Sequence, residues 1–91
     1  MLESQIQSKI IKALEEQGYY VIKIIKCNKN GIPDLLAMKK NDVFFVEVKA
    51  KKGVTAELQK FRIGELYEKG FPTYEIRSLS ELHEALLYHN R

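Results

Sequence analysis

The stretch FFVEVKAKK (Phe44–Lys52) constrains the fold of this chain more than any other. Its aromatic and β-branched residues favour a strand, in which successive side chains point to opposite faces. The apolar residues therefore share one face, and Glu47 and Lys49 share the other. An apolar strand of this kind is expected in the centre of a sheet, where charged side chains are normally paired or bound to metal. The fold must therefore place an acid and a base together on a central strand.

The remaining segments predict an α/β fold around this strand. Apolar residues at helical spacing, each run ending at or near a turn residue, predict helices over residues 2–18, 53–70 and 78–90. Thr55 is the expected N-cap of the second helix, and Ser78 with Glu81 has the spacing of a capping box. Segments 19–26, 34–40, 43–51 and 71–77 predict strands. The order α-β-β-β-α-β-α implies a mixed four-stranded sheet flanked by helices, with the fourth strand parallel to the third.

A tight turn at Asn41-Asp42 would set the register of the two middle strands. This register opposes Leu36 to Glu47 and makes Asp34 and Glu47 diagonal neighbours on one face of the sheet. Two carboxylates that converge in this way repel one another, and a divalent cation removes the repulsion. The sequence therefore predicts a metal site at the end of the hairpin.

Magnesium favours one or two carboxylates, backbone carbonyls and retained waters, so Asp34, Glu47 and the carbonyl of Val48 form a suitable ligand set. Lys49 would orient an attacking water and stabilise negative charge in the transition state. The pattern alone equally fits a solvated strand face with a cross-strand ion pair. Gly31 and Pro33, just before Asp34, suit either an acid delivered at a fixed angle or an ordinary loop.

Composition narrows the class of protein. Ninety-one residues predict a single domain, and 45% hydrophobic with 30% charged residues excludes a disordered chain. The net charge of +3 is compatible with a polyanion partner. The single cysteine, Cys27, excludes an internal disulfide and a thiolate zinc cluster. Without a signal-peptide pattern or a long apolar run, the expected compartment is the cytoplasm, or the host cytoplasm for a phage protein.

Two quoted segments, GIPDLLAM and FFVEVKAKKGVTAELQKF, carry a family resemblance. The chain resembles the PD-(D/E)xK nuclease superfamily and, within it, the VRR-NUC (virus-type replication-repair nuclease) family in its small stand-alone phage or bacterial form. Pro33-Asp34 matches the PD element, and Glu47-Val48-Lys49 matches ExK. The resemblance extends over nearly the whole chain, so residues 1–91 are expected to form one VRR-NUC-type domain.

The resemblance implies a DNA endonuclease that hydrolyses phosphodiester bonds with Mg²⁺ or Mn²⁺. Carried over residue by residue, Asp34 and Glu47 match the metal ligands and Lys49 the catalytic lysine. Gln59 matches a supporting glutamine. Glu3 matches an acid that the first helix contributes at the metal centre, with Glu15, Glu16 or no residue of this chain as the alternatives. Compact members resemble homodimers that act on branched DNA such as four-way junctions, and larger members cut flaps. The sequence leaves open a catalytically silent DNA-binding module or an accessory subunit of a phage replication complex.

The basic residues near the two loops of the site are candidate DNA phosphate contacts. These are Lys29, Lys51, Lys52, Lys60 and Arg62, together with the amides of Asn28 and Asn30. A chain this small spans about one turn of duplex, roughly 34 Å, so a two-fold dimer is needed to reach two strands of a junction. We expect the apolar faces of the first and third helices to form the dimer surface, and His83 and His89 to lie away from the site.

Overall fold

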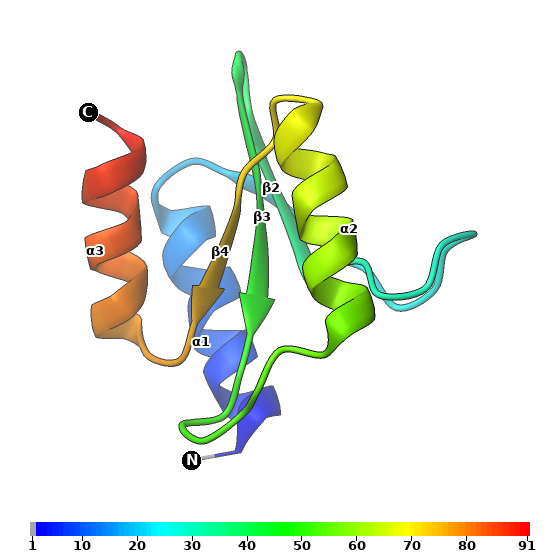
Figure 1. Ribbon diagram of the computed structural model, residues 1–91. Coiled ribbons are helices and arrows are strands. Elements are labelled where there is room, and N and C mark those ends of the chain that lie inside the picture. Colours follow the sequence, from blue (N-terminus) through cyan, green and yellow to red (C-terminus); the bar gives the residue numbers. More distant parts are fainter. Residues whose placement is uncertain (1) are drawn as a thin grey trace.

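The computed structural model describes residues 2–91, and its elements follow the predicted order (Figure 1). The helices are α1 (Glu3–Glu16), α2 (Glu57–Glu68) and α3 (Leu79–His89). The strands are β1 (Tyr20–Lys23), β2 (Leu35–Lys39), β3 (Asp42–Val48) and β4 (Thr73–Ile76). They form one sheet in the order β1-β2-β3-β4, in which only the β3–β4 pair is parallel among the described strands. The predicted mixed four-stranded α/β sheet is confirmed.

The two faces of the sheet are covered unequally. Helices α1 and α3 pack against one face and against each other, and α2 lies over the other face near β4 (Figure 1). The hydrophobic core lies on the α1–α3 side. It consists of Ile6, Ile10, Leu14, Tyr19, Leu35, Ala37, Phe44, Val46, Val48, Ile76, Leu82 and Leu86. None of the α2 residues, all of which are described, is buried.

The position of the core also limits which apolar surfaces can form a dimer. The core-facing apolar side chains of α1 and α3, such as Ile10 and Leu82, are buried within the same chain and are not available to a partner. Apolar side chains that remain accessible include Leu58 and Phe61 of α2, which are 46% and 59% exposed, and Leu87 of α3, which is 73% exposed. The surface available to a second copy therefore includes α2.

The β2–β3 hairpin closes one residue earlier along the chain than predicted. Lys39 pairs with Asp42, so the turn residues are Lys40 and Asn41, and the predicted turn at Asn41-Asp42 is wrong. Asn41 has φ +61°, a conformation that asparagine tolerates better than most residues. Asp42 belongs to the strand, because its carboxylate accepts hydrogen bonds from side chains elsewhere in the fold.

Two capping predictions meet different outcomes. Helix α2 begins at Glu57 after Ala56, so Thr55 is not its N-cap, and the Thr55 hydroxyl instead donates to the Glu75 carboxylate. Ser78 does cap α3, accepting the N–H of Glu81 at 3.2 Å. The Glu81 carboxylate reaches back to the N–H of Arg77, one residue before the cap. Within residues 2–91, no helix has the length and apolar character that a membrane span needs.

Candidate active site

Asp34 and Glu47 lie opposite each other at the end of β2 and β3. The observed register pairs Leu35 with Val46, and continuing it by one residue pairs Asp34 with Glu47. They are therefore direct neighbours across the strands rather than the diagonal neighbours expected. The predicted register is wrong by two in the sum of the paired numbers, and an even shift leaves each side chain on its predicted face.

Reciprocal hydrogen bonds tie these two acids together. The N–H of Asp34 donates to Glu47 Oε1 at 3.2 Å, and the N–H of Val48 donates to Asp34 Oδ2 at 3.0 Å. Each carboxylate is thus fixed by the backbone of the other residue's strand. Pro33, which is buried, precedes Asp34 and restricts the backbone where the strand begins.

Glu47 is a charged side chain in an almost closed position. It is 3% exposed, and its Oε2 lies 3.2 Å from the Lys49 ammonium, which is 15% exposed. Burial raises the pKa of Glu47, and the negative charge of Asp34 raises it further. The Lys49 ammonium and a hydrogen bond from Gln59 oppose this rise in the pKa. The structure therefore brings Asp34, Glu47, Lys49 and Gln59 together in one cluster.

Asp34 has similar electrostatics. Burial raises its pKa, and the N–H of Val48 opposes the rise. The charge of Glu3 adds to the rise, which places the N-terminal turn of α1 near Asp34, while Lys49 and Lys23 lower the pKa. Lys23 of β1 was not predicted at the site. Lys23 reaches the site because β1 pairs with β2, which places Lys23 beside Leu35. Knowledge of this strand pairing would have been needed to predict the position of Lys23.

The site has donors for a metal, although they are few. Across residues 2–91, no three or more His, Cys, Asp or Glu side chains stand close enough together to hold a metal ion, so Glu3 does not complete a three-carboxylate cluster. A hard cation such as Mg²⁺ nevertheless needs only one or two carboxylates when water fills the other positions. Two observations fit such an ion: the repulsion that raises the Glu47 pKa, and the buried Gln59 Oε1, which has no hydrogen-bond partner.

The predicted DNA contacts fall into two groups. Lys29, Lys51 and Lys52 are exposed on the loops beside the site, as are the side chains of Asn28 and Asn30. Lys60 and Arg62 of α2 already pair with Glu57 and Glu65 at 3.3 and 2.8 Å. Arg62 also donates to the carbonyl of Asn30 at 2.9 Å, so it holds the β1–β2 loop against α2.

The remaining polar residues singled out in the sequence lie away from the site. His83 is exposed on α3, and Cys27 is exposed on the β1–β2 loop. His89 interacts with Asp42 and, at 2.8 Å, with the Tyr74 hydroxyl, so it links α3 to the hairpin. This network was not predicted, because its members are far apart in the sequence.

Comparison with known proteins places this geometry in a family. The family model described as archaeal Holliday junction resolvase (Hjc) matches residues 4–70, which include every member of the cluster around Glu47. The chain belongs to this resolvase family. The resolvase family is one of nucleases, and membership supports a nuclease that acts on branched DNA. No protein of curated function matches the sequence significantly.

Solved structures agree on the fold. A structure titled "VRR_NUC domain" has a TM-score of 0.85 and 21% identity, with 96% of each chain covered. A second, titled "VRR_NUC domain protein", has a TM-score of 0.79 and 16% identity, covering 98% of this chain and 88% of the other. The fold that the resemblance to the VRR-NUC family implies is confirmed.

Proposed function

We propose that this chain, as a single domain over residues 1–91, is a Mg²⁺- or Mn²⁺-dependent endonuclease that hydrolyses phosphodiester bonds in branched DNA, such as four-way junctions or flaps, during replication or repair. The observation that carries the proposal is the Asp34–Glu47–Lys49 cluster, with Glu47 buried and the other two half-buried, in a chain of the resolvase family. The fold alone would not indicate hydrolysis, because one fold hosts many functions.

In this proposal, Asp34, Glu47 and the Val48 carbonyl hold the cation, with Gln59 supporting Glu47 and Glu3 adding negative charge at the rim. When bound there, such a cation would supply Lewis acidity toward the phosphate and would ease the ionisation of a water. The orphaned Gln59 Oε1 is an acceptor for a water in the same space.

Lys49 acts on the substrate. Its ammonium is held 3.2 Å from Glu47, and the Lys49 side chain is 15% exposed, which leaves it accessible to a phosphate at the mouth of the site. There it orients the attacking water and stabilises the charge that develops on the phosphate oxygens as water adds and the P–O bond breaks. Lys29, Lys51, Lys52, Lys60 and Arg62 supply backbone phosphate contacts around the site.

A second copy belongs to the same proposal. A junction presents two strands for cutting, and a two-fold dimer presents two sites. We further propose a cytoplasmic location, in the host cell for a phage-encoded chain, with phage replication proteins as candidate partners.

The decisive experiment compares cleavage of labelled four-way and flap substrates, with Mn²⁺ or Mg²⁺, by the natural protein and by Glu47→Ala and Lys49→Ala. Loss of the Lys49 ammonium should lower the rate by roughly 100-fold, as for other groups that stabilise a transition state. Arg91→Met removes a positive charge far from the site and serves as the control. Equal residual nicking by all four proteins would contradict the proposal and identify a contaminant. If the protein binds DNA equally well without metal and after substitution of Asp34, but does not cleave it, the chain is a catalytically silent DNA-binding module.

A further inference from the structure

The segment that joins Lys49 to α2 is held against β4 at three points. The N–H of Lys49 donates to the carbonyl of Ile76 at 3.1 Å. Farther along, Arg77 Nη2 donates to the carbonyl of Gly53 at 2.8 Å. The hydroxyl of Thr55 then donates to the Glu75 carboxylate. Two of these three contacts come from side chains of residues 75 and 77, which the cluster around Glu47 does not include.

The hydrogen bond from Arg77 to Gly53 holds a turn that directly follows Lys49 in the chain. The N–H of Gly53 donates to the carbonyl of Ala50 at 2.8 Å and closes a tight turn. A Cβ built at Gly53 would lie 3.2 Å from that carbonyl and 3.4 Å from Lys49 Cβ. The backbone of Gly53 therefore faces the base of the Lys49 side chain, with little room for a side chain between them. Because Gly53 and Ala50 close one tight turn directly after Lys49, a shift of Gly53 is expected to move Lys49 as well.

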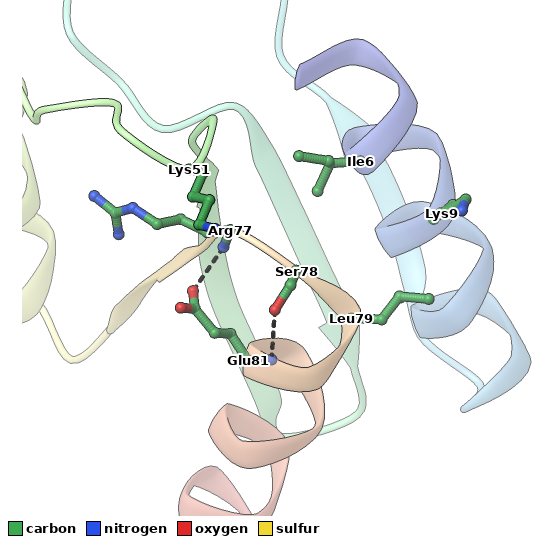
Figure 2. Close-up of a pocket in the computed structure, with 7 residues that line it drawn as sticks. All are labelled: Ile6, Lys9, Lys51, Arg77, Ser78, Leu79 and Glu81. Carbon is green, nitrogen blue, oxygen red and sulfur yellow. Dashed lines mark hydrogen bonds between the residues drawn. The ribbon is translucent and has the colours of Figure 1, made fainter. Parts of the chain in front are cut away.

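The backbone of Arg77 is held by the first turn of α3. Its N–H donates to Glu81 Oε1 at 2.7 Å, and Glu81 in turn is fixed by the Ser78 cap at the start of α3 (Figure 2). Figure 2 shows Arg77 and Lys51 together where the turn meets this end of α3. The capped start of α3 thus holds the backbone of Arg77, and from there the guanidinium reaches the Gly53 carbonyl.

We propose that Arg77 is a positioning residue for Lys49. Its guanidinium holds the Gly53 carbonyl, and through it the Lys49–Gly53 turn, so that the Lys49 ammonium stays at its 3.2 Å distance from Glu47. Arg77 acts through Gly53 rather than by touching the substrate. The inference rests on the proposed function, because it assigns a role to Arg77 only if Lys49 takes part in hydrolysis.

The test is single-turnover and steady-state cleavage of a labelled junction by Arg77→Met and Arg77→Lys. Small misplacements of a reacting group can cost up to about 100-fold in rate, so Arg77→Met should lose on the order of 10-fold to 100-fold in kcat with little change in KM. Arg77→Lys keeps one donor and should be intermediate. Millimolar guanidinium should partly restore kcat in Arg77→Ala, because Arg77 lines a cavity of about 560 Å³ that the truncation opens further. The same ion should not restore Lys49→Ala.

The controls separate this role from charge and from stability. Arg91→Met removes an equal charge elsewhere, and Leu86→Ala, at a buried α3 position, provides a variant of lowered stability. A loss confined to KM, or a loss in kcat no greater than that of Leu86→Ala at matched unfolded fraction, would overturn the positioning role. Thr55→Val removes the neighbouring hydrogen bond to Glu75 and should also lower kcat. This variant tests the proposal if Arg77→Met does not fold. If Lys49→Ala retains full activity, the proposed role of Lys49 in hydrolysis fails, whatever Arg77 does; if Glu47→Ala retains it as well, the proposed function fails.

Discussion

At the scale of single residues, the candidate site depends on carboxylates that repel one another and yet remain ordered. Asp34 and Glu47 each accept a backbone N–H from the opposite strand, and Lys49 neutralises part of their charge. These bonds hold the geometry before any cation arrives. Preorganisation of this kind is what allows a site to stabilise a transition state without rearranging.

Asp34 therefore has two separable roles, as an acceptor for the N–H of Val48 and as a charge. Asp34→Asn keeps an acceptor oxygen and removes the charge, whereas Asp34→Ala removes both. Without metal, we expect Asp34→Asn to be at least as stable as the natural protein and Asp34→Ala to lose about 1–3 kcal/mol, the cost of a buried donor left unpaired. Both should lose at least on the order of 10-fold in Mn²⁺ affinity. Thermal unfolding and calorimetric titration with Mn²⁺ check both expectations.

Either of two results would contradict this division. If Mn²⁺ stabilises Asp34→Asn as much as the natural protein, Asp34 does not bind the metal, because the stabilisation by a bound ion grows with the logarithm of its concentration divided by its Kd. If Asp34→Asn is as unstable as Asp34→Ala, the Val48 hydrogen bond is not what Asp34 contributes.

At the scale of elements, Asp42 connects the β2–β3 hairpin to the end of α3. Burial opposes ionisation of Asp42, but hydrogen bonds from His89 and Tyr19 outweigh it and lower the pKa of this carboxyl. A carboxyl with a lowered pKa contributes stability that is present above its unfolded pKa and is lost as pH falls through the folded pKa. The link between hairpin and helix should therefore weaken in acid.

We expect Asp42→Asn to lower the free energy of unfolding by about 2 kcal/mol at neutral pH, the usual contribution of hydrogen bonds to a charged group. The difference from the natural protein should narrow as pH falls below about 4, where the unfolded carboxyl takes up its proton. Urea unfolding at several pH values measures this difference. A gap that does not change with pH would show that the charge of Asp42 contributes nothing.

Glycine positions provide a second prediction at this scale. Gly31 has φ +84°, and a Cβ there would lie 2.8 Å from Leu58 Cγ and 3.3 Å from the Leu58 backbone. Gly70 has φ +97° with nothing within 4 Å, so it serves as a matched control for the backbone conformation alone. Gly70→Ala should cost about 1–2 kcal/mol, and Gly31→Ala distinctly more, because it also pushes the β1–β2 loop away from α2. Equal losses of unfolding free energy would show that the close approach to Leu58 is unimportant.

The elements of the fold were predictable because each is recorded in a short stretch of sequence. Apolar spacing identified α1 and α3, and β-branched residues identified β3, including which face carries Glu47. The turn was misplaced by one residue, since Asp42 is drawn into the strand by Tyr19 and His89, which lie 23 and 47 positions away. Thr55 was misassigned for the same reason, because its partner Glu75 is 20 positions away. Local patterns do not contain such contacts.

The site was predictable to the same extent. Asp34, Glu47 and Lys49 could be placed from alternation along two strands, and alternation survives a register error of two. Lys23, Glu75 and Arg77 could not be placed, because their relation to the site depends on which strands are neighbours and on the β3–β4 register. Sequence pattern therefore identified the residues within the hairpin and missed those that neighbouring strands bring to it.

At the scale of the whole molecule, size sets what one chain can do. The molecule measures 33 × 30 × 23 Å, which is comparable to about one turn of duplex, roughly 34 Å. One chain can therefore hold a single phosphodiester together with its flanking phosphates. A four-way junction offers two such strands related by a two-fold axis, so a symmetric pair of chains matches it.

A dimer through α2 is the last expectation, and it follows from where the apolar surface is left. Phe61 is 59% exposed and Leu58 46% exposed on a helix that contributes nothing to the core of its own chain. Phe61→Asp should therefore shift the protein from twice 10.6 kDa to a single chain while leaving thermal stability nearly unchanged, since exposed substitutions usually alter it by less than about 0.5 kcal/mol. Sedimentation and native mass spectrometry measure the mass, and Leu87→Asp, at an exposed position on α3, is the matched control. The same variant separates the oligomeric state from the chemistry. Because a monomer retains one complete Asp34–Glu47–Lys49 cluster, Phe61→Asp should still nick a flap but should no longer cut both strands of a junction in one binding event. If a monomeric Phe61→Asp protein still cuts both strands, α2 is not needed to present two sites.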